Sequence, residues 1–123
     1  MLRKLEEIEP LLSERGIVAE WRSETRLVLR GVIRFIDGSR LVFLEYLVER
    51  GGAVHRIAYR FHYEDALGNM IFRYDNAPHH PGLPTFPHHK HLGDGRVVAA
   101  REPSLPNVID EVVSLLRRTD SGG

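Results

Sequence analysis

The chain has 123 residues, 42% of them hydrophobic, and a formal net charge of zero. This length suits one domain with a real core, and the balanced charge gives no global attraction to nucleic acid. The absence of cysteine excludes disulfides, thiolate metal sites, iron–sulfur clusters and a cysteine nucleophile.

No apolar run approaches the ~20 residues that a membrane span needs. The N-terminus, MLRKLEEIEP, is too acidic and too short in apolar residues for a signal peptide. We therefore expect a cytoplasmic protein without a membrane partner.

The first predicted element is a helix over residues 2–15. Apolar residues recur there at helical spacing, with charges between them: Leu2, Leu5, Ile8 and Leu12. Pro10 interrupts the pattern, which predicts a kink or two short helical pieces, and Gly16 is expected to end the helix.

A four-stranded antiparallel meander is predicted next. Apolar and polar residues alternate over 25–36, 40–49, 53–63 and 70–75, and the turns between these segments contain glycine. Strict alternation places Ile57 on the apolar face with the aromatic residues. The opposite face collects Arg30, Arg34, Arg56, Arg60, His62, Arg73 and Asp75, with Glu45 as the main balancing acid. This face is either a functional surface or a solvated face with cross-strand ion pairs.

Residues 72–91 form a segment dense in proline that holds five of the seven histidines: His79, His80, His88, His89 and His91. Such a segment does not continue a helix or a central strand, and loops on a rigid scaffold often carry function. A short strand is expected at 88–91, where His89 and His91 share one face and His88 and Lys90 share the other.

The chain then closes with a turn at 93–95, a strand at 96–100 and a helix. Ser104 is the expected N-cap, and a broad apolar stripe follows it. Residues 119–123 are expected to be a frayed tail. The predicted fold is α+β: one domain over 1–123, with an antiparallel meander sheet of five to six strands and N-terminal and C-terminal helices packed on one face.

Three kinds of chemistry suit the histidine segment. A metal site is one, with His89 and His91 as a pair that His79 or His80 and Asp75 complete. Metal-independent cleavage of RNA is the second, because RNA supplies its own 2′-hydroxyl nucleophile and imidazoles can move the protons. In the third, the histidines only hold the loop by hydrogen bonds.

The segment FRYDNAPHHPGLPTFPHHKH, followed by LGDG, resembles the signature of the TumE family of prokaryotic toxin–antitoxin systems. The resemblance continues upstream through YRFHY and GNMIFRYDNAPHH and downstream to the helix after EPSL, so it covers most of the chain. The motif falls on Arg73, Tyr74, Asp75, Asn76, His79, His80, His88, His89, Lys90 and His91. It implies a small toxin of a type II pair, encoded beside an antitoxin of the helix-turn-helix DNA-binding type. A ribonuclease activity is expected only by analogy with small toxins in general.

The sequence therefore predicts a toxin that acts on RNA as a metal-independent endoribonuclease without a cofactor. The candidate catalytic residues are His88, His89, Lys90, His91, Arg60, Arg73, Tyr74 and Asp75, and His79 and His80 are expected mainly to shape the loop. Arg60 and Arg73 should lie on the same side as the histidines. A non-catalytic binding module and a metal-dependent enzyme that uses His89 and His91 stay open as alternatives. The oligomeric state, a homodimer included, is also open.

Overall fold

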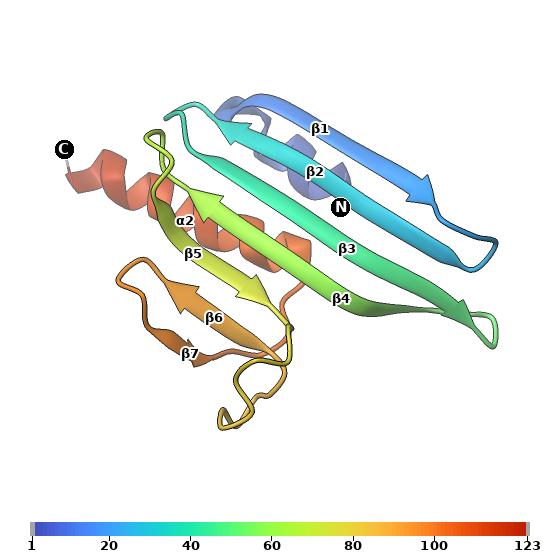
Figure 1. Cartoon of the computed structure of the whole chain (residues 1–123). Coiled ribbons are helices and arrows are strands. Elements are labelled where there is room, and N and C mark those ends of the chain that lie inside the picture. The colour runs from blue at the N-terminus through green and yellow to red at the C-terminus, as the bar shows by residue number, and fades with distance from the viewer. Residues whose placement is uncertain (1, 123) are drawn as a thin grey trace.

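The structure is a computed structural model that describes residues 2–122, and the side chains of residues 3–118. One antiparallel sheet dominates it, and its strands are hydrogen-bonded in sequence order (Figure 1). The elements are α1 (Leu2–Glu7), the 3-10 turn η1 (Glu9–Leu11), β1 (Leu12–Trp21), β2 (Arg26–Phe35), β3 (Arg40–Arg50), β4 (Ala53–Glu64), β5 (Met70–Asp75), β6 (His89–Leu92), β7 (Val97–Ala99) and α2 (Leu105–Gly122). The α+β class and the meander are confirmed, but the sheet has seven strands rather than five or six.

The additional strand is β1, which the sequence pattern had placed partly in a helix. Helix α1 ends at Glu7, Pro10 lies in η1, and Gly16 is inside β1 rather than at a helix end. Because β1 is an edge strand whose side chains are mostly exposed, it lacks the alternation that reveals a half-buried strand. The expected helix over 2–15 is therefore wrong beyond its first two turns.

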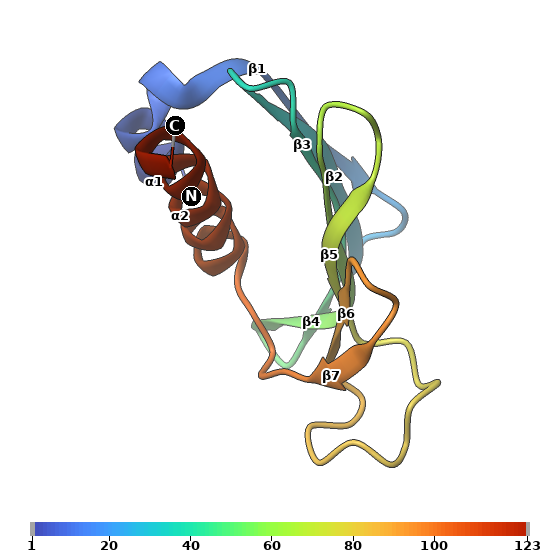
Figure 2. The same ribbon diagram turned by 90° about the vertical axis from the view of Figure 1, so that its left-hand side faces the viewer.

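The core lies between one face of the sheet and the helices. Figure 2 views the sheet nearly edge-on and shows α1 and α2 together on one side of it. The buried cluster combines residues of α1, of α2 and of the sheet: Leu5, Ile8, Ile33, Phe35, Leu41, Phe43, Tyr59, Phe61, Tyr63, Phe72, Leu105, Val108, Ile109, Val112, Val113 and Leu116. The large apolar stripe predicted for the C-terminal helix thus covers the sheet.

A register shift between β3 and β4 changes which side chains face the helices. Tyr46 pairs with Ala58 and Leu47 pairs with Arg56, so Ile57 is an extra residue in β4. Arg56 consequently turns to the helix side, where its guanidinium lies 4.3 Å from the centre of the Tyr59 ring.

Arg56 also lies 3.8 Å from Glu45, which is on the same side of the sheet. The placement of both residues on the Arg-rich face was wrong. At Arg56 the bulge in β4 reverses the alternation on one side of it, whereas Glu45 follows the regular alternation of β3 and shares the face of the buried Leu41 and Phe43. Ile57, expected in the core, is 41% exposed.

Helix α2 begins as the sequence predicted. The backbone N–H of Asn107 donates to Oγ of Ser104 at 3.2 Å, which makes Ser104 the N-cap. The helix continues to Gly122, so it includes residues 119–122 of the expected tail, and Gly123 lies outside the described residues. Within residues 2–122, no helix is long and apolar enough to cross a membrane.

Gly31 of β2 is a position where only glycine fits. A Cβ atom there would lie 2.7 Å from the Phe43 ring and 2.7 Å from the carbonyl oxygen of Gly16. We predict that Gly31→Ala lowers the free energy of unfolding by about 1–3 kcal/mol, because the ring and the β1 backbone must both shift. Gly16→Ala is the matched control, since a Cβ at Gly16 has no atom within 4 Å. Equal denaturation midpoints for the two variants would contradict the prediction.

Candidate functional site

The site is built by the pairing of β5 with β6. In this antiparallel pair Asp75 lies opposite His89 and Arg73 opposite His91. Partners in such a pair project to the same face of the sheet, and residues two apart in one strand do so as well. The backbone alone therefore gathers one carboxylate, two imidazoles and a guanidinium on the face away from the helices.

The Asp75 carboxylate lies between the two imidazoles. Its Oδ1 is 2.9 Å from Nε2 of His89, and its Oδ2 is 3.2 Å from Nε2 of His91. The two Nε2 atoms are themselves 3.1 Å apart. Nδ1 of His89 lies 2.9 Å from the carbonyl oxygen of Pro87, and the backbone N–H of Ala77 donates to Oδ1 of Asp75 at 3.0 Å. Hydrogen bonds with the backbone therefore hold both His89 and Asp75 in place.

Burial distinguishes the members of this group. His89 is 2% exposed and Asp75 is 8% exposed, whereas the side chain of His91 is 27% exposed. Burial lowers the pKa of His91, the nearby Asp75 carboxylate opposes this shift, and His89 adds to it. The neutral imidazole is therefore favoured at His91, and this ring is the one that solvent and a ligand reach.

His80 joins the group from the loop 76–88. Its ring centre lies 4.7 Å from that of His89 and 5.9 Å from that of His91, and both contacts are edge-on. One ligand atom each of His80, His89 and His91 lies within 4.8 Å of the others. His80 is expected mainly to shape the loop; the structure places it against the β6 histidines, while His79 is exposed. No spacing rule reveals this contact, because the path of an irregular loop decides it.

These residues line a pocket of about 540 Å³, and among the described residues that line it Asp75 is the only carboxylate. Arg60 and Arg73 line the same pocket, which confirms that they lie on the side of the histidines. Nε of Arg73 donates to Nδ1 of His62 at 3.2 Å. Among the described residues Arg60 has no ion pair or hydrogen-bond partner for its side chain, so its charge is available to a ligand.

Three of the predicted catalytic residues lie on the opposite face. Nζ of Lys90 is 2.6 Å from Oε2 of Glu111 on α2, and the Tyr74 hydroxyl donates to Oε1 of the same residue at 2.5 Å. His88 stacks on the ring of Tyr59 and lies 2.9 Å from its hydroxyl. The structure therefore does not bring His88, Lys90 or Tyr74 to the pocket.

Asn76, another residue of the motif, supports the backbone. Its Oδ1 accepts from the N–H of Tyr59 at 3.1 Å, and its Nδ2 donates to the carbonyl of Ile57 at 3.1 Å. These bonds hold β4 beside the start of the loop, next to the bulge. Asn76 thus positions the pocket wall, although it also lines the pocket.

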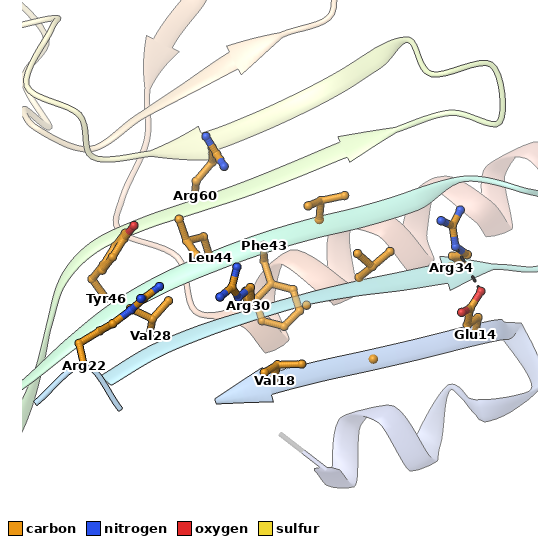
Figure 3. Close-up of a pocket in the computed structure, with 14 residues that line it drawn as sticks. Glu14, Val18, Arg22, Val28, Arg30, Arg34, Phe43, Leu44, Tyr46 and Arg60 are labelled. Carbon is orange, nitrogen blue, oxygen red and sulfur yellow. Dashed lines mark ion pairs between the residues drawn. The ribbon is translucent and has the colours of Figure 1, made fainter. Parts of the chain in front are cut away.

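A second hollow of about 610 Å³ adjoins the histidine pocket on the same face. The two share Leu44, Tyr46 and Arg60 as lining residues. Figure 3 shows Arg22, Arg30, Arg34 and Arg60 spread along this groove over an apolar floor that includes Val28 and Phe43. Three of these arginines pair with acids: Arg22 and Arg30 with Glu20, and Arg34 with Glu14. The expected Arg-rich face is present here through Arg30, Arg34 and Arg60. The pairs of Arg30 and Arg34 join β2 to β1, so they are the cross-strand ion pairs that were the alternative explanation of this face.

Comparison with known proteins shows that the chain belongs to a class of toxins. Residues 1–118 match the family model described as Toxin TumE. The chain therefore belongs to the TumE family, as the histidine motif indicated, and membership implies a cognate antitoxin. No curated protein and no solved structure matches the chain.

The contacts of Glu111 predict a structural role for Lys90 and Tyr74. Glu111→Ala should lower the free energy of unfolding by about 1–3 kcal/mol, because it leaves the partly buried Lys90 ammonium and Tyr74 hydroxyl without their acceptor. Arg117→Ala, which removes an exposed charge on the same helix, serves as the control. Chemical denaturation of both variants gives the comparison, and an unchanged midpoint for Glu111→Ala would show that these bonds contribute no stability.

Proposed function

We propose that this protein is the growth-inhibiting toxin of a type II pair, acts in the cytoplasm on RNA, and cleaves it without a metal ion. A cognate antitoxin of the helix-turn-helix type, encoded beside it, is its expected partner. The single observation that carries the proposal is the pocket in which His80, His89, His91 and Asp75 meet Arg60 and Arg73. These are the groups that transesterification of RNA requires: two proton carriers and fixed positive charge for the phosphate.

The two accessible imidazoles are assigned to proton transfer. His91 accepts the proton of the 2′-hydroxyl, and the 2′-oxygen then attacks phosphorus. The bond from phosphorus to the 5′-oxygen breaks, and His80 donates a proton to that oxygen. The products are a 2′,3′-cyclic phosphate and a 5′-hydroxyl, so no water, oxidant or cofactor is consumed.

His89 and Asp75 act as positioning residues in this proposal. His89 is too buried to reach a substrate, but its ring contacts both His80 and His91. Asp75 accepts from His89 and His91 at once, which fixes the orientation of both rings.

Arg60 and Arg73 are assigned to the phosphate. A guanidinium presents several N–H donors in one plane, which suits the equatorial oxygens that gain charge in the transition state. Magnesium-dependent chemistry on phosphates relies on carboxylate ligands, whereas this pocket has one carboxylate among its described residues, already shared by two histidines. Metal-independent chemistry therefore fits the residues better than magnesium-dependent chemistry.

The proposal predicts that His91→Ala slows RNA cleavage by about 10²–10⁴-fold, because a proton carrier is lost. His80→Ala should have a comparable effect, and His55→Ala, which removes an exposed histidine at the far end of β4, should have none. Cleavage is measured with end-labelled RNA in the presence of a chelator, and growth inhibition is measured on expression without antitoxin.

Thermal melts of each variant separate loss of chemistry from loss of fold. Full toxicity in folded His80→Ala and His91→Ala would refute the assignment. Products with a 5′-phosphate, or cleavage that the chelator abolishes, would refute the metal-independent reaction. Specific binding of RNA without cleavage would favour the alternative, a non-catalytic binding module.

The adjoining groove is proposed to hold the RNA backbone that leads to the pocket. It combines arginines with Tyr46, whose exposed ring offers a surface on which a base can stack. For an uncleavable 2′-O-methyl RNA, Arg60→Gln should weaken binding and reduce the slope of log affinity against log salt by about 0.7. Arg101→Gln, an exposed arginine outside both hollows, is the control. An identical salt slope for wild type and Arg60→Gln would exclude Arg60 as a phosphate contact.

A further inference from the structure

The charge state of the Asp75–His89–His91 group depends on what lies between its atoms. The carbonyl of Pro87 can only accept a hydrogen bond, so Nδ1 of His89, at 2.9 Å from it, carries a hydrogen. In the neutral ring Nε2 then carries a lone pair. That lone pair faces Oδ1 of Asp75 at 2.9 Å and Nε2 of His91 at 3.1 Å.

The lone pair of His89 and Oδ1 of Asp75 repel each other at this separation unless a hydrogen or a metal ion lies between them. One possible occupant is a hydrogen on Nε2 of His89 that is donated to Asp75. The other is a metal ion, for which the same three atoms are ligands. The bond from Nδ1 of His89 to a backbone carbonyl is the support that a metal-binding histidine ordinarily has.

We propose that the histidine pocket binds one zinc ion through His80, His89, His91 and Asp75. A tetrahedral zinc ion with bonds of about 2.0–2.1 Å holds its ligand atoms roughly 3.3 Å apart. The Nε2 atoms of His89 and His91 are 3.1 Å apart, close to this requirement, and each has one carboxylate oxygen of Asp75 beside it: Oδ1 lies 2.9 Å from His89 and Oδ2 lies 3.2 Å from His91.

His80 supplies the fourth ligand from the loop. Its ligand atom lies within 4.8 Å of those of His89 and His91, so the binding of zinc would draw these three nitrogens closer together. The donor set of three imidazoles and one carboxylate, without thiolates, suits zinc and other late transition metals rather than magnesium.

Zinc in this position would switch off the proposed ribonuclease. The metal would bind one ring nitrogen each of His80 and His91 and thereby use the single lone pair of the neutral imidazole, so neither ring could take up the proton that it must accept or pass on. This regulatory consequence rests on the proposed function, whereas the binding itself does not.

Binding is tested by titrating chelator-treated, dialysed protein with Zn²⁺ in a calorimeter and with Co²⁺ in a visible-absorption experiment. The expected result is one ion per chain, with the intense visible bands of tetrahedral Co²⁺. The melting temperature should rise with Zn²⁺ concentration, because the metal binds only the folded chain.

Adjacent histidines provide a matched pair of variants. His80→Ala should weaken Zn²⁺ binding by about tenfold or more, since a ligand is lost, whereas His79→Ala should leave it unchanged. His91→Ala is the second ligand variant, and its partly exposed side chain makes it less harmful to folding than His89→Ala. Absence of binding to wild type, or equal affinity in His79→Ala, His80→Ala and His91→Ala, would overturn the site.

The activity measurement separates this inference from the proposed function. Cleavage of RNA that Zn²⁺ inhibits, and that a chelator restores, supports the inhibitory site. RNA cleavage with no metal binding overturns the zinc site and leaves the ribonuclease standing. Metal binding by a protein that cleaves no RNA supports the site and overturns the ribonuclease. Cleavage that Zn²⁺ stimulates supports the site but overturns its inhibitory role.

Discussion

The Asp75 carboxylate, shared by His89 and His91, is the interaction on which the site depends. It is almost buried, and it accepts from two imidazoles and from the backbone of Ala77. Removal of one partner leaves a buried donor or acceptor unsatisfied, which in general costs about 1–3 kcal/mol. The β5–β6 pairing that brings Asp75 beside His89 therefore maintains both the chemistry and the local fold.

Alternate side chains of β6 have two different roles, because one set faces the pocket and the other packs against α2. His89 and His91 face the pocket, whereas Lys90 points to α2 and pairs with Glu111. Tyr74 of β5 reaches the same glutamate. The helix thus holds the two strands from behind while the open face stays accessible. A motif that looks uniform in sequence is half structural and half available to a ligand, so its residues have unequal roles.

The alternation of side chains along the strands made the facing of many site residues predictable from the sequence. It placed His89 and His91 on one face, and it placed Arg60 and Arg73 beside them, because a regular strand needs only a period of two. It failed at Arg56, where the extra residue Ile57 shifts the register, and a bulge has no reliable signature in a single sequence. It also missed β1, since an edge strand with few buried side chains leaves no hydrophobic pattern.

His80 shows a different limit, and it matters most for the chemistry. Pro78 and Pro81 flank the His79–His80 pair and fix the backbone there, which suggested that both histidines mainly have a structural role in the loop. The path of the loop instead returns one of two adjacent histidines to the β6 pair and leaves the other exposed. A rule based on composition cannot distinguish two neighbouring residues of the same type. Their difference arises only from tertiary contacts, and this difference turns a pair of strand histidines into a cluster with enough donors to bind a metal ion or to move two protons.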